Sequence, residues 1–82
     1  MGYHLKKIKK GKLGESSKIK EEVEELIDSE NQECKIMVLV ELSDIFGAIE
    51  LYLQMNFPGV TMKDLEKMSK ITQRAFKSGA RK

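Results

Sequence analysis

Two pairs of carboxylates form the clearest chemical pattern in this chain. Glu22 and Glu25 are separated by three positions, and Glu41 and Asp44 repeat that spacing further along. Residues three positions apart lie on the same face of an α-helix, so each pair can share one cation. A ligand set made only of carboxylate oxygens favours a hard ion, and Mg²⁺ or Mn²⁺ is therefore the expected metal.

The second pair lies inside the most apolar stretch of the sequence, MVLVELSDIFGAIELYL, which starts at Met37. In a helical projection, several apolar side chains fall within about 60° of Glu41, whereas Glu50 points to the opposite, polar side. A buried carboxylate without a partner is costly. Three explanations are open: an ion pair with a lysine or arginine, a helix less buried than its pattern indicates, or a divalent cation.

The first pair lies in the segment KIKEEVEELID, where four acids crowd into residues 21–25. Measured from the apolar stripe of this segment, Glu22 lies at about 85° and Glu25 further round on the same side, while Glu21 is nearly opposite. We therefore expect Glu22 and Glu25 at the seam with the second acidic helix, and Glu21 and Glu24 on a solvated face. Packed together, the two pairs would form a four-carboxylate cage. The reference stripe consists of Ile19, Val23, Leu26 and Ile27.

Helical spacing of the apolar residues predicts three helices, over residues 17–28, 31–55 and 61–77. Ser29 followed by Gln32 has the pattern of a capping box and predicts the start of the second helix. Pro58 ends that helix, and a further capping box, Thr61 with Asp64, opens the third. The expected fold class is all-α, an antiparallel helical bundle in which the second and third helices form a hairpin.

The chain divides into an irregular basic arm, residues 1–14, and a single helical domain, residues 15–82. A domain of this size buries a small fraction of its surface. The second helix carries apolar side chains on two flanks, which one chain has too few helices to cover. We therefore expect oligomerisation to complete the bundle, as a homodimer or homotetramer. The two flanks consist of Leu39, Phe46 and Leu53 on one side and Ile36, Val40 and Leu51 on the other.

Charge is segregated along the chain, although the net charge is only +2. Residues 1–20 hold seven lysines and one acid, residues 21–50 hold ten acids and one lysine, and residues 51–82 hold seven basic residues and two acids. This order favours a cation in the middle or an anion at the ends. Lys70 and Arg74 on the third helix are the expected phosphate contacts. The lysines of the arm either close over phosphate or form an unspecific tail.

Other features narrow the cellular setting. The single cysteine, Cys34, cannot form an internal disulfide, which fits a reducing, cytoplasmic location. No apolar segment follows the basic start, so we expect no signal peptide, and no charge-free apolar stretch is long enough to span a membrane. His4 is the single histidine, and we expect it to be an exposed bystander near the terminus.

The stretch EEVEEL followed by VELSDIFGAIE resembles the MazG-like, all-α nucleoside triphosphate pyrophosphohydrolases, over roughly residues 13–55. The resemblance implies that the four cage acids are catalytic Mg²⁺ ligands, since Leu26 follows the first pair as a leucine does in that family. It also implies a nucleoside triphosphate substrate, cleaved at the α–β phosphoanhydride into a monophosphate and pyrophosphate. The helix that precedes the first acidic pair in the family is replaced here by residues 1–14.

Two other functions fit parts of the pattern. A small basic protein that binds nucleic acid or senses nucleotides without catalysis would use the arm and the third helix, although few aromatic residues interleave these segments. A purely structural helical oligomer would pair the buried acids with lysines. A cation that binds only the folded state raises the thermal midpoint, so a metal-dependent melt separates the cage from the structural oligomer.

Overall fold

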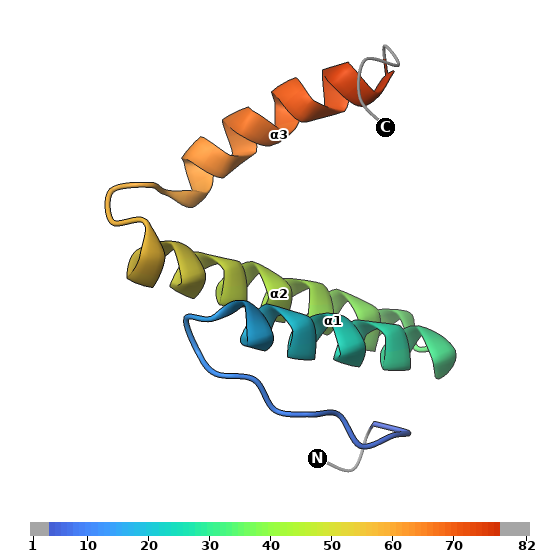
Figure 1. The fold of residues 1–82 in the computed structure, drawn as a ribbon. Helices are drawn as coiled ribbons and strands as arrows, with labels where there is room; N and C mark the ends of the chain where they lie inside the picture. The colour runs from blue at the N-terminus through green and yellow to red at the C-terminus, as the bar shows by residue number, and fades with distance from the viewer. Residues whose placement is uncertain (1–3, 78–82) are drawn as a thin grey trace.

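The computed structural model describes the backbone of residues 4–77 and the side chains of residues 4–74. This part of the chain contains three helices and no strand: α1 (Ser16–Asn31), α2 (Lys35–Asn56) and α3 (Met62–Lys77) (Figure 1). The all-α prediction is therefore confirmed. Residues 78–82 of the expected domain lie outside the described part.

The turn between α1 and α2 does not begin where the sequence pattern placed it. Ser29 caps no helix; it is buried within the last turns of α1, which continues to Asn31. Its backbone carbonyl accepts hydrogen bonds from the N–H groups of Gln32 and Cys34, so the chain turns after α1, with Glu33 at a φ of 58°. The second helix accordingly starts at Lys35 instead of residue 31.

The start of α3 was predicted correctly. Asp64 accepts a hydrogen bond from the backbone N–H of Thr61 at 2.9 Å, and the Thr61 hydroxyl accepts one from the N–H of Asp64 at 3.3 Å. This reciprocal pair satisfies two donors of the first turn and lowers the pKa of Asp64. The preceding turn contains Pro58 and Gly59, whose φ of 95° suits glycine.

The helices do not close into a bundle within one chain. α1 and α2 pack side by side as an antiparallel hairpin, whereas α3 leads away from both and touches them sparsely (Figure 1). The expected hairpin of the second and third helices is therefore replaced by a hairpin of the first two. An open groove of about 440 Å³ remains between α2 and the start of α3, lined in part by Phe46, Ile49 and Leu65.

The α1–α2 pair buries polar residues and exposes apolar ones. The apolar stripe predicted for α1 is not its buried face, since Val23 and Ile27 are exposed. The physical reason is the arm: residues 4–15 run back alongside α1 from near its last turn to its first (Figure 1). Backbone N–H groups of the arm donate to buried acids of α1, from Leu5 to Asp28 and from Gly11 to Glu21. The buried residues of α1 are Glu21, Glu22, Glu25, Asp28 and Ser29.

The apolar flanks of α2 are mostly uncovered, as expected for a single chain. Ile36, Leu39 and Val40 are exposed, and so is Phe46, whereas Leu53 is buried. The structure therefore leaves Phe46 on an open flank of α2. No helix in the described residues is long and apolar enough to cross a membrane.

Candidate metal centre

Four carboxylates from two helices converge at the middle of the α1–α2 seam. α1 supplies Glu22 and Glu25, and α2 supplies Glu41 and Asp44. Each residue has an oxygen that lies within 4.8 Å of the corresponding oxygens of the other three. The first three are buried and Asp44 is exposed, so the cluster, here called the cage, opens on one side.

Glu41 is the most unusual member of the cage. It is 0% exposed, and neither of its carboxylate oxygens has a hydrogen-bond partner among the described residues. Within the same residues, no lysine or arginine pairs with Glu41 or Asp44. Burial, followed by the charges of Glu25 and Asp44, raises the pKa of Glu41 to about 7. A buried carboxylate in this state needs a proton or a cation.

The other buried members of the cage are only partly neutralised. Burial and the neighbouring charge of Glu22 raise the pKa of Glu25. Lys18 lies 3.1 Å from both Glu22 and Glu21 at the rim of the cage. Burial would lower the pKa of Lys18, but its hydrogen bonds to these two acids raise it, so the ammonium is a fixed positive charge beside the cage.

His4 lies at the cage and is not an exposed bystander, which corrects the expectation from the sequence. Its Nδ1 is 3.1 Å from Asp28 Oδ2, and its Nε2 is 3.4 Å from Glu25 Oε1. The arm carries the ring there because the backbone N–H of Leu5 also donates to Asp28, at 2.8 Å. Both His4 and Asp28 were missed as site residues.

Glu21 is buried, which also corrects the expectation of a solvated position. Its Oε1 accepts hydrogen bonds from the backbone N–H of Gly11 at 2.8 Å and from Lys18 at 3.1 Å. Although burial opposes it, the bond from Gly11 lowers the pKa of Glu21, so this acid is an ionised anchor for the arm. A Cβ at Gly11 would collide with the carbonyl of Ser17, so the close approach of arm and helix requires glycine.

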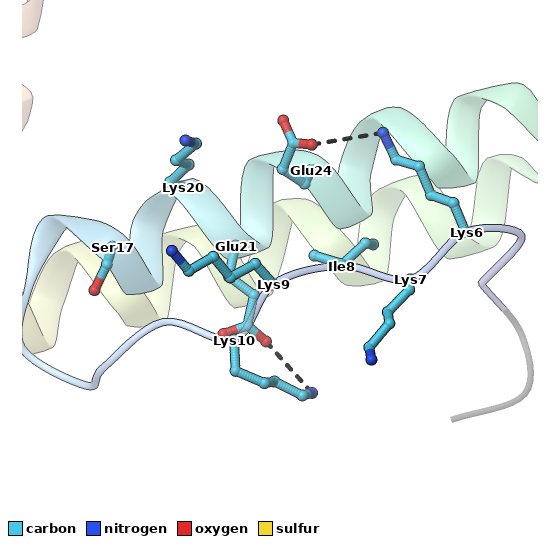
Figure 2. Close-up of a pocket in the computed structure, with 9 residues that line it drawn as sticks. All are labelled: Lys6, Lys7, Ile8, Lys9, Lys10, Ser17, Lys20, Glu21 and Glu24. Atoms are coloured by element: carbon cyan, nitrogen blue, oxygen red, sulfur yellow. Dashed lines mark ion pairs between the residues drawn. The ribbon is translucent and has the colours of Figure 1, made fainter.

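Lysines of the arm surround two hollows. One, of about 440 Å³, is lined by Lys6, Lys7, Lys10 and three of the cage acids. The other, of about 390 Å³, lies between the arm and the outer side of α1. Figure 2 shows this second hollow, with Lys6 paired to Glu24 at 3.5 Å and Lys10 paired to Glu21 at 3.6 Å. Lys7 points away from the helices in the same view.

The structure does not bring Lys70 and Arg74 to the cage of their own chain. Both are exposed on α3, and neither lines the cavity beside the cage. Their role as phosphate contacts stays a prediction, and it requires a second copy of the chain.

Polar residues that recur at helical spacing in α1 are the pattern from which the missed site residues could have been predicted. Polar residues recur along α1 and the following turn at helical spacing, as apolar residues do on an ordinary core face. Asp28 belongs to this series and lies three residues after Glu25, which marks it as part of the same face. The series consists of Lys18, Glu21, Glu22, Glu25, Asp28, Ser29 and Gln32.

Comparison with other proteins does not assign this chain to a family. No family model, curated protein or solved structure matches this chain. Any function assigned to it therefore depends on the cage and on the groups around it.

Proposed function

We propose that this protein is a divalent-cation-dependent nucleoside triphosphate pyrophosphohydrolase of the MazG-like kind, acting in the cytoplasm. The observation that carries the proposal is the cage, in which four carboxylates present oxygens within 4.8 Å of one another. Glu41 makes a cation necessary for full ionisation, because its oxygens are buried without hydrogen-bond partners among the described residues. These all-oxygen ligands fit a hard ion, and Mg²⁺ or Mn²⁺ is the proposed occupant.

Each cage residue has its own place in this proposal. Glu22, Glu25 and Glu41 would hold the ion from the buried side, and exposed Asp44 would hold it from the side that is open to solvent. Lys18 orients Glu22 through their contact at 3.1 Å. A bound divalent cation neutralises charge on a phosphate chain and lowers the pKa of water.

The arm supplies the proposed contacts for the outer phosphates. The cavity of about 440 Å³ is lined both by cage acids and by lysines, so an anion there meets positive charge directly beside the cage. Lys7 is the best candidate, because it forms no ion pair with any described residue, whereas Lys6 and Lys10 are paired with acids of α1. Lys7 can therefore bind phosphate without losing an existing contact.

The test is a screen of nucleoside triphosphates for release of pyrophosphate, with and without millimolar Mg²⁺. Hydrolysis by the wild-type protein should require the metal, and Glu41→Gln should abolish it while the helical content is kept. Glu50→Gln is the matched control, because Glu50 lies exposed on the same helix. Nucleotide binding without pyrophosphate release would instead identify a nucleotide-sensing protein.

We also propose that the active form is a homodimer or homotetramer in which α3 of one chain covers α2 of another. α2 exposes large apolar side chains, including Leu39 and Phe46, and α3 exposes Met68 and Ile71. Neither surface covers the other within one chain, so a second copy provides the complementary apolar face for both.

A further inference from the structure

The arm holds the single imidazole of the chain between two groups of acids. His4 Nδ1 faces Asp28 at 3.1 Å, while Nε2 lies 3.4 Å from Glu25 Oε1 and 3.7 Å from Glu41 Oε2. The ring is 11% exposed, so its position is set by protein contacts. Its ε nitrogen is thus directed at the inner side of the cage.

Asp28 fixes the orientation of this ring. It is buried, and the oxygen that faces His4 also accepts hydrogen bonds from the backbone N–H of Leu5 at 2.8 Å and from Gln32 Nε2 at 3.0 Å. Although burial opposes it, these bonds lower the pKa of Asp28, so the carboxylate is ionised. In the neutral ring, an ionised acceptor on this side keeps the proton on Nδ1 and turns the Nε2 lone pair toward the cage.

We propose that His4 Nε2, Glu25 and Glu41 form a second cation position, for a transition ion such as Zn²⁺ or Co²⁺, which shares both carboxylates with the cage. One ligand atom from each residue lies within 4.8 Å of the other two. An independent observation also points to a ligand: the oxygens of Glu41 are buried and have no hydrogen-bond partner among the described residues. Asp28 completes the arrangement common in metal proteins, in which a ligating histidine donates its other N–H to a carboxylate.

The nitrogen ligand separates this position from the oxygen-only cage. Mg²⁺ prefers oxygen ligands and is held weakly by imidazole, whereas Zn²⁺ and Co²⁺ bind imidazole well. The two positions therefore select different ions, and the shared Glu25 and Glu41 couple their occupancy. The inference goes beyond the proposed hydrolase function, since it requires a cation beside His4 but no turnover.

A doubly protonated His4 is the competing arrangement, in which the ring bridges the acids as a fixed cation. Nitrogen NMR of the full-length protein distinguishes the two, because the chain contains one histidine and so one pair of ring signals. At pH 7.5, stoichiometric Zn²⁺ should move the Nε2 signal to the position of a metal-bound nitrogen while Nδ1 keeps its proton. Zn²⁺ binding that leaves both ring nitrogens protonated would overturn the proposal.

Titration calorimetry with Zn²⁺ alone and Mg²⁺ alone gives the second measurement. His4→Gln should weaken Zn²⁺ binding by more than about 100-fold, because it removes the ligand, while Mg²⁺ affinity changes by less than about twofold. Asp28→Asn should weaken Zn²⁺ binding about 10–100-fold, because it removes the orienting charge and keeps the ligand. Equal weakening for both ions, or unchanged Zn²⁺ affinity, would overturn the proposal. Zn²⁺ binding through His4 without pyrophosphate release would leave it standing and refute only the hydrolase.

Discussion

The two faces of the α1–α2 pair have opposite characters. The face under the arm, here called the acidic face, buries Glu21, Glu22, Glu25, Asp28 and Glu41. The face away from the arm, here called the apolar face, exposes Ile36, Leu39, Val40, Leu42 and Phe46. Soluble helices ordinarily show the reverse distribution, with carboxylates in water and large apolar side chains in the core.

The difference indicates what each face lacks. Carboxylates repel one another when buried, so the acidic face needs positive charge or hydrogen-bond donors beside it. Lys18 of α1 and the backbone N–H groups of the arm supply these in part. An exposed large apolar side chain forgoes roughly 1.5–3 kcal/mol of burial free energy. This difference is the reason for proposing a cation at the acidic face and another copy of the chain at the apolar face.

The largest expected effect comes from removing the charge at the centre of the acidic face. Without metal at pH 8, Glu41→Gln should raise the free energy of unfolding by roughly 1–3 kcal/mol, because it replaces a carboxylate whose pKa is raised to about 7 by burial. The same substitution should eliminate the rise in melting temperature that we expect millimolar Mg²⁺ to give the wild type. Chemical denaturation and thermal melts measure the two quantities.

Glu50→Gln again serves as the control and should change stability by less than about 0.5 kcal/mol. If Glu41→Gln instead destabilised the metal-free protein by about 3 kcal/mol, the acid would be half of a buried ion pair. The purely structural oligomer would then be the better account of the acidic face.

The acidic face also shows which part of the structure could be predicted from the sequence. Glu41 was placed correctly on a buried face, because apolar neighbours share its side of α2. The buried face of α1 was predicted wrongly, because it packs against backbone N–H groups and a histidine of the arm. The arm is irregular, so its contacts with α1 leave no periodic pattern in the sequence. The three helices follow from apolar spacing, whereas the outward course of α3 does not, because few contacts hold α3 against the other two helices.

A second effect follows from the protonation of the same face. Glu41 has a pKa of about 7 in the folded protein against 4.5 in the unfolded chain, so between these values the folded state holds a proton that the unfolded chain has released. Stability of the metal-free protein is therefore highest near pH 5 and falls by roughly 1–3 kcal/mol as the pH rises to about 7. Mg²⁺ must displace that proton, so its affinity should rise over the same range. A flat metal-free profile from pH 5 to 8 would contradict this.

A single charged substitution tests whether the apolar face mediates self-association. Phe46→Glu should weaken self-association about 30-fold or more, which corresponds to about 2 kcal/mol for a central aromatic contact. Gln54→Glu adds the same charge on the polar side of α2 and should leave association unchanged. Sedimentation at micromolar concentration measures both. A folded wild-type monomer that retains activity would refute the second copy as the cover of this face.

The smallest expected effect concerns Glu21 of α1, which is buried on the acidic face. It anchors the arm and is not one of the four cage acids. Glu21→Gln keeps an oxygen for the N–H of Gly11 and loses the charge that binds Lys18, so unfolding should become easier by about 1 kcal/mol. Glu24→Gln, in which a half-exposed acid loses Lys6, should cost less than about 0.5 kcal/mol. Both variants should keep the Mg²⁺ response that Glu22→Gln abolishes. If Glu21→Gln and Glu22→Gln lost that response equally, Glu21 would also take part in binding the metal. The distinction between Glu21 as an anchor for the arm and Glu22 as a cage acid would then be wrong.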